Sequence, residues 1–215
     1  MPLIGDILLL CYNLFRHRSF KGSILYWEER YSKGGSSGPG SYKVSAKYKA
    51  EILNKFVEEE KISTVIEFGC GDGNQLLLSC YNSYIGLDVS VTAIRKCIEV
   101  FKNDKSKSFY QYNSLAFRDN HQLFSSDLSL SLDVIYHLVE DDIFDKYMTH
   151  LFNSSRQYVI IYAWDVEGEQ RNHVKHRKFT SWIEKHQTSW SLIDKIENSL
   201  NEGVASDFYI FKKLQ

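Results

Sequence analysis

The sequence has little net charge, few cysteines and no long apolar segment, and each of these shortages argues against a class of protein or site. A formal net charge of -1 gives the chain as a whole no basic surface for nucleic acid. The four cysteines form no C-x-x-C pair, which argues against a zinc ribbon or a disulfide framework and favours reduced thiols in the cytoplasm. The 215 residues, 43% of them hydrophobic, suit one globular domain with a short extension.

The longest apolar stretch, Leu3–Phe15, is shorter than the roughly 20 residues that span a bilayer. Asp6 and Asn13 interrupt it, and its basic residues follow it, whereas in a signal peptide they would precede it. We therefore expect residues 1–26 to form a helical extension. It packs on its own domain or on a partner, or it lies on a membrane surface.

Residues 27–45 contain glycines and serines around Pro39, which excludes regular structure and predicts a linker or an active-site lid. Residues 46–215 alternate between helical and strand patterns. The expected strands are 64–68, 84–87, 108–112, 128–132, 158–162, 191–196 and 207–212, and the expected helices are 46–60, 74–81, 92–101, 141–152 and 178–186. This pattern predicts an α/β fold with a doubly wound, mostly parallel seven-stranded sheet. The last strand should be antiparallel, because the closing pair has no room for a helical crossover.

The most informative segment is the turn after the first expected strand, Glu67-Phe-Gly-Cys-Gly-Asp-Gly-Asn74. Its three glycines permit positive φ angles and let a ligand approach the main chain closely. Asp88 ends the second expected strand, where a carboxylate can accept both hydroxyls of a ribose. The turn and the acid together predict a nucleoside site at the carboxyl ends of these strands.

Two kinds of nucleotide cofactor compete for this turn. A turn that binds a dinucleotide has the sequence G-x-G-x-x-G, sometimes with Ala in place of the last Gly. Here the third glycine comes one position early, and Asn74 takes the sixth position. Asp72 would also repel a pyrophosphate. S-adenosylmethionine (SAM) has no phosphate, and its sulfonium and ammonium cations are favoured by acids, so the residues favour SAM.

The segment Glu67–Asn74 resembles motif I of the class I SAM-dependent methyltransferases. Asp88 matches the acid after their second strand, and Ser129–His137 resembles their fourth strand and the turn after it; the similarity extends over residues 27–214. The resemblance implies a Rossmann-like methyltransferase fold, with SAM as cofactor and S-adenosylhomocysteine (SAH) as product. Together with the Trp27–Tyr31 segment, these motifs are most similar to small methyltransferases of glycan assembly, which implies a sugar hydroxyl as acceptor.

The resemblance also implies a set of cofactor contacts. These are Glu67, Gly69, Cys70, Gly71, Asp72, Gly73, Asp88, Val89, Asn113, Leu132, Arg30 and Tyr31. The glycines would line the methionine portion, Asp88 would bind the ribose, and Val89 and Asn113 would lie beside the adenine. Arg30 would hold the SAM carboxylate while Tyr31 closes over the cofactor, unless this part of the chain is a plain linker.

A hydroxyl acceptor is hard to deprotonate, so a general base is expected near the methyl group. His137 is the candidate base, with Asp133 four residues earlier to orient it or to touch the cofactor; a structural histidine is the alternative. Substrate contacts are expected after the fifth strand. They are Trp164, His173, His176 and Arg177, and a solvated basic loop is the alternative there.

No metal site is expected. Glu140, Asp141 and Asp142 begin an expected helix, where the helix dipole favours acids, and no third ligand completes a zinc site with the histidines of residues 173–176. We expect a glycan or small-molecule acceptor, no nucleic acid, and contact with a membrane or protein only through the N-terminal helix. A small-metabolite methyltransferase and a non-catalytic SAM-binding scaffold remain as alternatives.

Overall fold

The computed structural model describes residues 20–200 and 205–214. The apolar stretch 3–15, and with it most of the expected extension 1–26, lies outside the described residues. Within the described part of the chain, no helix combines the length and apolar character needed to cross a bilayer.

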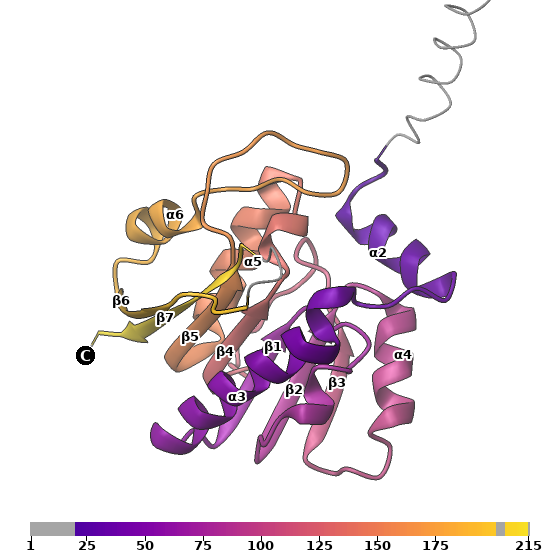
Figure 1. Ribbon diagram of the computed structural model, residues 1–215, viewed down its shortest axis with the longest axis horizontal. Helices are drawn as coiled ribbons and strands as arrows, with labels where there is room; N and C mark the ends of the chain where they lie inside the picture. The colour runs from indigo at the N-terminus through magenta and orange to yellow at the C-terminus, as the bar shows by residue number, and fades with distance from the viewer. Residues whose placement is uncertain (1–19, 201–204, 215) are drawn as a thin grey trace, which may run out of the picture.

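One seven-stranded sheet forms the centre of the molecule (Figure 1), with the strand order β3-β2-β1-β4-β5-β7-β6. Its strands are β1 (Thr64–Phe68), β2 (Ser83–Asp88), β3 (Lys107–Gln111), β4 (Ser126–Leu132), β5 (Ser155–Ala163), β6 (Trp190–Ile196) and β7 (Asp207–Lys213). The pairs from β3 to β5 are parallel, and β7 runs antiparallel to both β5 and β6. The predicted α/β sheet with an antiparallel last strand is confirmed.

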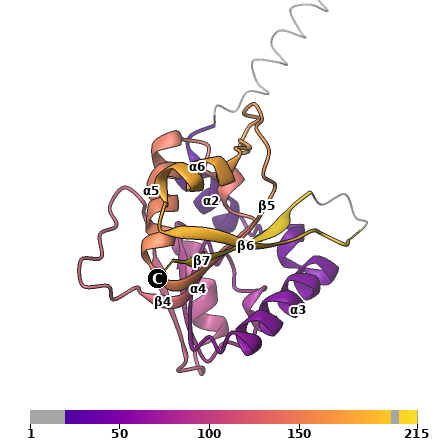
Figure 2. The same cartoon turned by 90° about the vertical axis from the view of Figure 1, so that its left-hand side faces the viewer.

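Helices cover both faces of this sheet (Figures 1 and 2). On one face pack α3 (Lys43–Glu59) and α4 (Val91–Val100); on the other pack α5 (Asp141–Asn153) and α6 (Phe179–His186). Every residue of β4 is buried, as expected for a central strand covered on both sides. The remaining helix, α2 (Ser23–Ser32), packs beside the start of α4.

Two expectations about local structure differ from what is observed. Instead of a helix over residues 74–81 there is one short 3-10 turn, η2 (Leu76–Leu78). Asn54 of α3 donates to the Leu78 carbonyl and accepts from the Cys80 amide, which holds the chain extended beyond the turn. Segment boundaries also differ, because α2 crosses the expected boundary at residues 26–27 and α3 begins before residue 46.

Candidate active site

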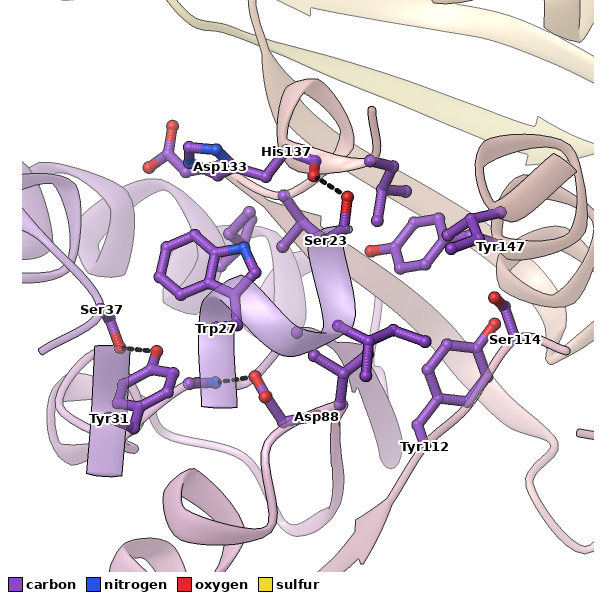
Figure 3. A pocket seen from close by; sticks show the side chains of 18 of the residues that line it. Ser23, Trp27, Tyr31, Ser37, Asp88, Tyr112, Ser114, Asp133, His137 and Tyr147 are labelled. Carbon is purple, nitrogen blue, oxygen red and sulfur yellow. Dashed lines mark hydrogen bonds between the residues drawn. The ribbon is translucent and has the colours of Figure 1, made fainter. Parts of the chain in front are cut away.

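The glycine turn after β1 lines a cavity at the carboxyl ends of the parallel strands (Figure 3). Gly69 and Gly71 line this first cavity with φ angles of 85° and 59°. A Cβ on Gly69 would lie 2.5 Å from Val134 Cγ2, and one on Gly71 would collide with Ser37 Oγ. Both the backbone angle and the available space therefore require glycine at these two positions.

Asp88 lies at the end of β2 and faces the same cavity. Gly71 N donates to its Oδ2 at 2.9 Å and Ser90 N to its Oδ1 at 2.8 Å. Burial raises the pKa of Asp88 to about 6, although the two amides oppose this rise. The carboxylate is thus fixed in place and retains lone pairs for the hydroxyls of a ligand.

The opposite end of the first cavity is aromatic, with Tyr112, Ser114 and Tyr147 gathered there (Figure 3). Tyr147 donates to the Phe68 carbonyl at 2.9 Å, which fixes its ring. Asn113, the residue expected beside the adenine, does not line the cavity, and its side chain accepts a hydrogen bond from a backbone amide two residues later. Because successive residues after a strand point to opposite sides, the neighbouring Ser114 takes that place.

The segment that was expected to be a lid or a linker covers this cavity. Trp27 and Tyr31 of α2 line it, and the Tyr31 hydroxyl lies 3.0 Å from Ser37 Oγ. Burial raises the pKa of Tyr31 far above its usual range, so the phenol stays neutral. We call residues 23–42 the lid segment.

The lid segment is anchored at two points on α2. In the middle of the helix, Glu28 accepts hydrogen bonds from the hydroxyls of Ser90 and Thr92, each at 2.6 Å, and these bonds lower its pKa. At the first residue of the helix, Ser23 donates to Glu140 from its amide at 2.8 Å and from its hydroxyl at 2.6 Å. These contacts tie α2 to the elements on either side of the cavity.

Asp72 fastens the loop of the lid segment to the glycine turn. Its carboxylate accepts hydrogen bonds from the Ser37 amide, the Ser37 hydroxyl and the Tyr42 hydroxyl at 2.8–3.0 Å. Burial opposes ionisation, but these hydrogen bonds outweigh it and lower the pKa of Asp72. Asp72, expected to contact the cofactor, does not line the first cavity, and in this structure its carboxylate holds the lid segment.

Three other expected cofactor contacts lie behind the glycine turn and do not line the first cavity. Glu67 is buried and accepts a hydrogen bond from Tyr84 at 2.7 Å, and burial raises its pKa to about 7. Cys70 is likewise buried, and a Cβ on Gly73 would lie 3.0 Å from Cys97 Sγ. These residues shape the turn from below.

A second, larger cavity adjoins the first, between the lid segment, the turn after β4 and the loop after β5. Three of the expected substrate residues line it: Trp164, His173 and His176. The side chains that line both cavities belong to Trp27, Ser37, Ser41, Asp133 and His137. We call these five residues the junction. The two residues expected to be catalytic, His137 and Asp133, are therefore placed where the cavities meet.

His137 has a defined tautomer at the junction. Its Nδ1 lies 3.1 Å from the His173 carbonyl, which can only accept, so Nδ1 carries the proton and Nε2 is the free acceptor. The ring meets Trp27 edge-on at 4.9 Å. Burial lowers the pKa of His137 to about 4, so the imidazole is neutral at physiological pH.

Asp133 does not orient His137, contrary to expectation. Its Oδ2 lies 2.8 Å from Lys49 Nζ and its Oδ1 accepts from the Tyr136 hydroxyl at 3.0 Å. The chain turns sharply at Asp133, with φ at 60°, and continues into the 3-10 turn η3 (Ile135–His137), so the helical four-residue spacing is absent. Lys49 of α3 is fully buried and was missed, although it shares a helix face with the buried Ala46 and Leu53.

Two basic residues occupy other places than expected. Arg177 does not line either cavity; it donates to the Leu138 and Val139 carbonyls at 2.6 and 2.8 Å and pairs with Asp141. It braces the start of α5, and its position gives no support to the expected substrate contact. Arg30 lines the second cavity and not the first, so an expected contact with the SAM carboxylate finds no support in its position.

The acids at the start of α5 are also engaged with protein partners. Glu140 accepts from Ser23, and Asp141 pairs with Lys175 as well as Arg177. Across residues 20–200 and 205–214, no group of three or more histidine, cysteine, aspartate or glutamate side chains is placed to hold a metal ion.

Comparison with known proteins shows that the chain is similar to methyltransferases. No family model matches the chain. A small RNA 2'-O-methyltransferase from Arabidopsis thaliana is 28% identical over 128 residues, which cover 50% of this chain but only 13% of that protein. The structure of the methyltransferase domain of bacterial CtHen1-C aligns with a TM-score of 0.64 and 20% identity, covering 79% of this chain and 98% of the domain. The N-methyltransferase NodS from Bradyrhizobium japonicum, solved with SAH, aligns with a TM-score of 0.70 and 13% identity, covering 91% and 100%.

The chain has the class I methyltransferase fold. In this methyltransferase fold the first cavity lies at the carboxyl ends of β1, β2 and β4, where a doubly wound sheet binds its ligand. The described residues that line it include two carboxylates, Asp88 and Asp133, and no lysine or arginine. This lining fits SAM, which carries cationic groups, and does not fit a dinucleotide, whose pyrophosphate needs neutralising donors.

Proposed function

We propose that this protein is a SAM-dependent methyltransferase whose acceptor is a sugar hydroxyl. The observation that supports this most strongly is the junction, where the cavity at the strand ends and a larger, aromatic-lined cavity share Asp133, His137 and Trp27. A methyl donor in the first cavity and an acceptor in the second would meet there. Transfer in line between two such partners requires alignment and exclusion of water more than any covalent help from the protein.

The residues of the first cavity suit the parts of SAM. Asp88 would accept the ribose hydroxyls, Tyr112 and Ser114 would contact the adenine, and the main chain at Gly69 and Gly71 would allow close approach of the methionine portion. When bound, SAM supplies a methyl group on a sulfonium and leaves as SAH. Trp27 and Tyr31 of the lid segment would exclude water from above.

His137 is the proposed general base. As the acceptor oxygen forms its bond to the methyl carbon and the carbon–sulfur bond breaks, the hydroxyl proton passes to His137 Nε2. The bond from Nδ1 to the His173 carbonyl keeps the required tautomer and stabilises the imidazolium that forms. Asp133, held by Lys49 and Tyr136, supplies the negative charge at the junction that favours this imidazolium.

The walls of the second cavity favour a sugar. Tyr136, Tyr162 and Trp164 offer aromatic faces, and neutral His173 and His176 offer hydrogen-bonding nitrogens for hydroxyl groups. Oxygen as the methylated atom also agrees with the name of the Arabidopsis relative, which specifies a 2'-O position of small RNA. That sequence match makes the ribose of an RNA a second candidate acceptor.

Calorimetric titration of SAM and SAH into the full chain tests the cofactor half of this proposal. Tritium transfer from labelled SAM to a panel of sugar glycosides, and in parallel to short RNA oligonucleotides, tests the acceptor half. Transfer to a glycoside supports the proposal, whereas transfer to RNA alone moves the second candidate to the front. Binding of SAH without transfer to any hydroxyl compound would favour the non-catalytic scaffold.

A further inference from the structure

Two charged side chains line the second cavity, Arg30 and Asp133, and they differ in whether a partner of opposite charge lies nearby. Asp133 has its partner in Lys49 at 2.8 Å, but no described residue places a carboxylate within 4.0 Å of the Arg30 guanidinium. Arginine is always ionised, and an unpaired cation facing a cavity is costly unless water or a ligand satisfies it. The cavity wall thus carries one uncompensated positive charge.

The lid segment is shaped to hold this guanidinium in place. Arg30 Nε donates to the Ser36 carbonyl at 2.7 Å, and the guanidinium lies over the Trp27 ring at 5.6 Å. A Cβ on Gly35 would lie 2.8 Å from Arg30 Cγ, so the loop needs glycine there to wrap around the side chain. The two terminal amino groups donate to no described residue, which leaves a preorganised fork of donors.

The histidines of the second cavity do not add to this charge. Burial lowers the pKa of His137, His173 and His176, and the nearby Arg30 charge lowers it further for the first two. At neutral pH the described lining therefore has one cation, Arg30, and one anion, Asp133, and Asp133 is already paired with Lys49, which lies outside the lining; the unpaired charge is that of Arg30. A neutral acceptor would make no use of it.

We propose that the acceptor carries a negatively charged group, a phosphate or a carboxylate, which Arg30 binds through its terminal amino groups while the sugar ring lies against the aromatic wall. The identity of the acceptor as a sugar rests on the proposed function, but the anion site itself does not depend on SAM. Planar guanidinium forks match both anions with two parallel hydrogen bonds. An anionic sugar therefore gains a contact that its neutral counterpart lacks.

The test compares three sugars that differ in charge: glucose, glucuronate and glucose 6-phosphate. Each is titrated into the full chain, with and without saturating SAH, and binding is followed by NMR of the tryptophan indole groups. The variant is Arg30→Gln. Lys33→Gln is the matched control, because it removes the same charge from the same segment at an exposed position outside the cavity. SAH affinity and thermal unfolding of both variants show whether the fold and the first cavity are intact.

We expect at least one anionic sugar to bind about tenfold more tightly than glucose. This advantage should disappear in Arg30→Gln and persist in Lys33→Gln. Preference for glucose 6-phosphate alone would identify a phosphate, and preference for glucuronate alone a carboxylate. The inference is overturned if the anionic sugars bind no better than glucose, if their advantage survives in Arg30→Gln, or if Arg30→Gln weakens SAH instead. Failure of the wild type to bind SAH would count against the proposed function and leave the anion comparison measurable without cofactor.

Discussion

The two cavities are built in different ways. One wall of the first is made by the ends of β1, β2 and β4, where Gly69, Gly71 and residues 88–89 and 132–134 line it and backbone amides hold the Asp88 carboxylate; the lid segment covers it. The second is assembled from the lid segment, the turn after β4 and the loop after β5, which meet through side chains. A site made by strand ends comes with the fold, whereas a site made by added loops is particular to the chain. Mutations in one cavity should therefore change cofactor binding or acceptor choice without changing the other.

The largest effect is expected at the junction, where the two cavities share His137. Replacing His137 with Gln removes the proposed base, and turnover should fall by about 10²- to 10⁴-fold while SAH still binds. Steady-state rates and calorimetry on the same protein measure both quantities. His186→Gln, an exposed histidine on α6, is the control. Because burial lowers the pKa of His137 to about 4, the acid limb of the wild-type rate profile should lie near pH 4 and not near 6.5. Wild-type turnover by His137→Gln would remove this residue as the base.

The next effect concerns the stability of the wall between the cavities. Lys49→Met leaves Asp133, a carboxylate whose side chain is 17% exposed, without its cation, which should lower the free energy of unfolding by about 3 kcal/mol. Urea denaturation measures this loss. Lys55→Met on the same helix breaks only an exposed pair with Glu59 and should cost less than about 0.5 kcal/mol. Equal losses in the two variants would mean that the pair between Lys49 and Asp133 contributes no more to stability than an exposed pair.

A smaller effect separates the cavities directly. Asp88→Ala removes the proposed ribose acceptor, and SAH affinity should fall about ten- to hundredfold, equivalent to about 1.5–3 kcal/mol. Calorimetry measures this change. Asp88 does not line the second cavity, so binding of glucose 6-phosphate should be the same as in the wild type. Loss of both ligands together would contradict the separation of the two sites.

The smallest effect is the response of cofactor binding to pH. The pKa of Asp88 is raised to about 6 by burial, so the carboxylate is ionised at pH 7 and becomes protonated as the pH falls through 6. SAH affinity should therefore decline between pH 7 and pH 5, by at most about tenfold per pH unit. In Asp88→Asn the affinity should be lower at pH 7 and nearly independent of pH over this range. A slope that persists in this variant would assign the effect to another group.

The sheet and the first cavity were largely predictable from sequence because their signals are local. The strand β1 is a short, mostly apolar run that ends in a glycine turn, and Asp88 ends the next strand, so the turn and the acid lie at one edge once the strands pair in parallel. The antiparallel β7 followed from the length of its connection. These features need no knowledge of distant contacts.

Contacts between distant segments were not predictable. Lys49 looks like any helix lysine until α3 packs beside the turn that carries Asp133, 84 positions along the chain. Arg177 was predicted to contact the acceptor because its loop is basic, but its guanidinium donates hydrogen bonds to two carbonyls just before α5. The missing helix over residues 74–81 likewise reflects Asn54 from another element. In each case a tertiary partner decided the outcome.

The hydrogen bonds that hold α2 in place have a consequence for the turnover rate. A molecule in the first cavity lies beneath Trp27 and Tyr31, and the helix that carries them is tied by Glu28 to the start of α4 and by Ser23 to Glu140. Opening of α2 to release SAH would break these bonds, and they would have to form again before the next round. We therefore expect departure of the spent cofactor, and not the chemical step, to limit turnover. A rapid burst of methylated product in the first round, followed by a slower steady rate, would be its kinetic signature.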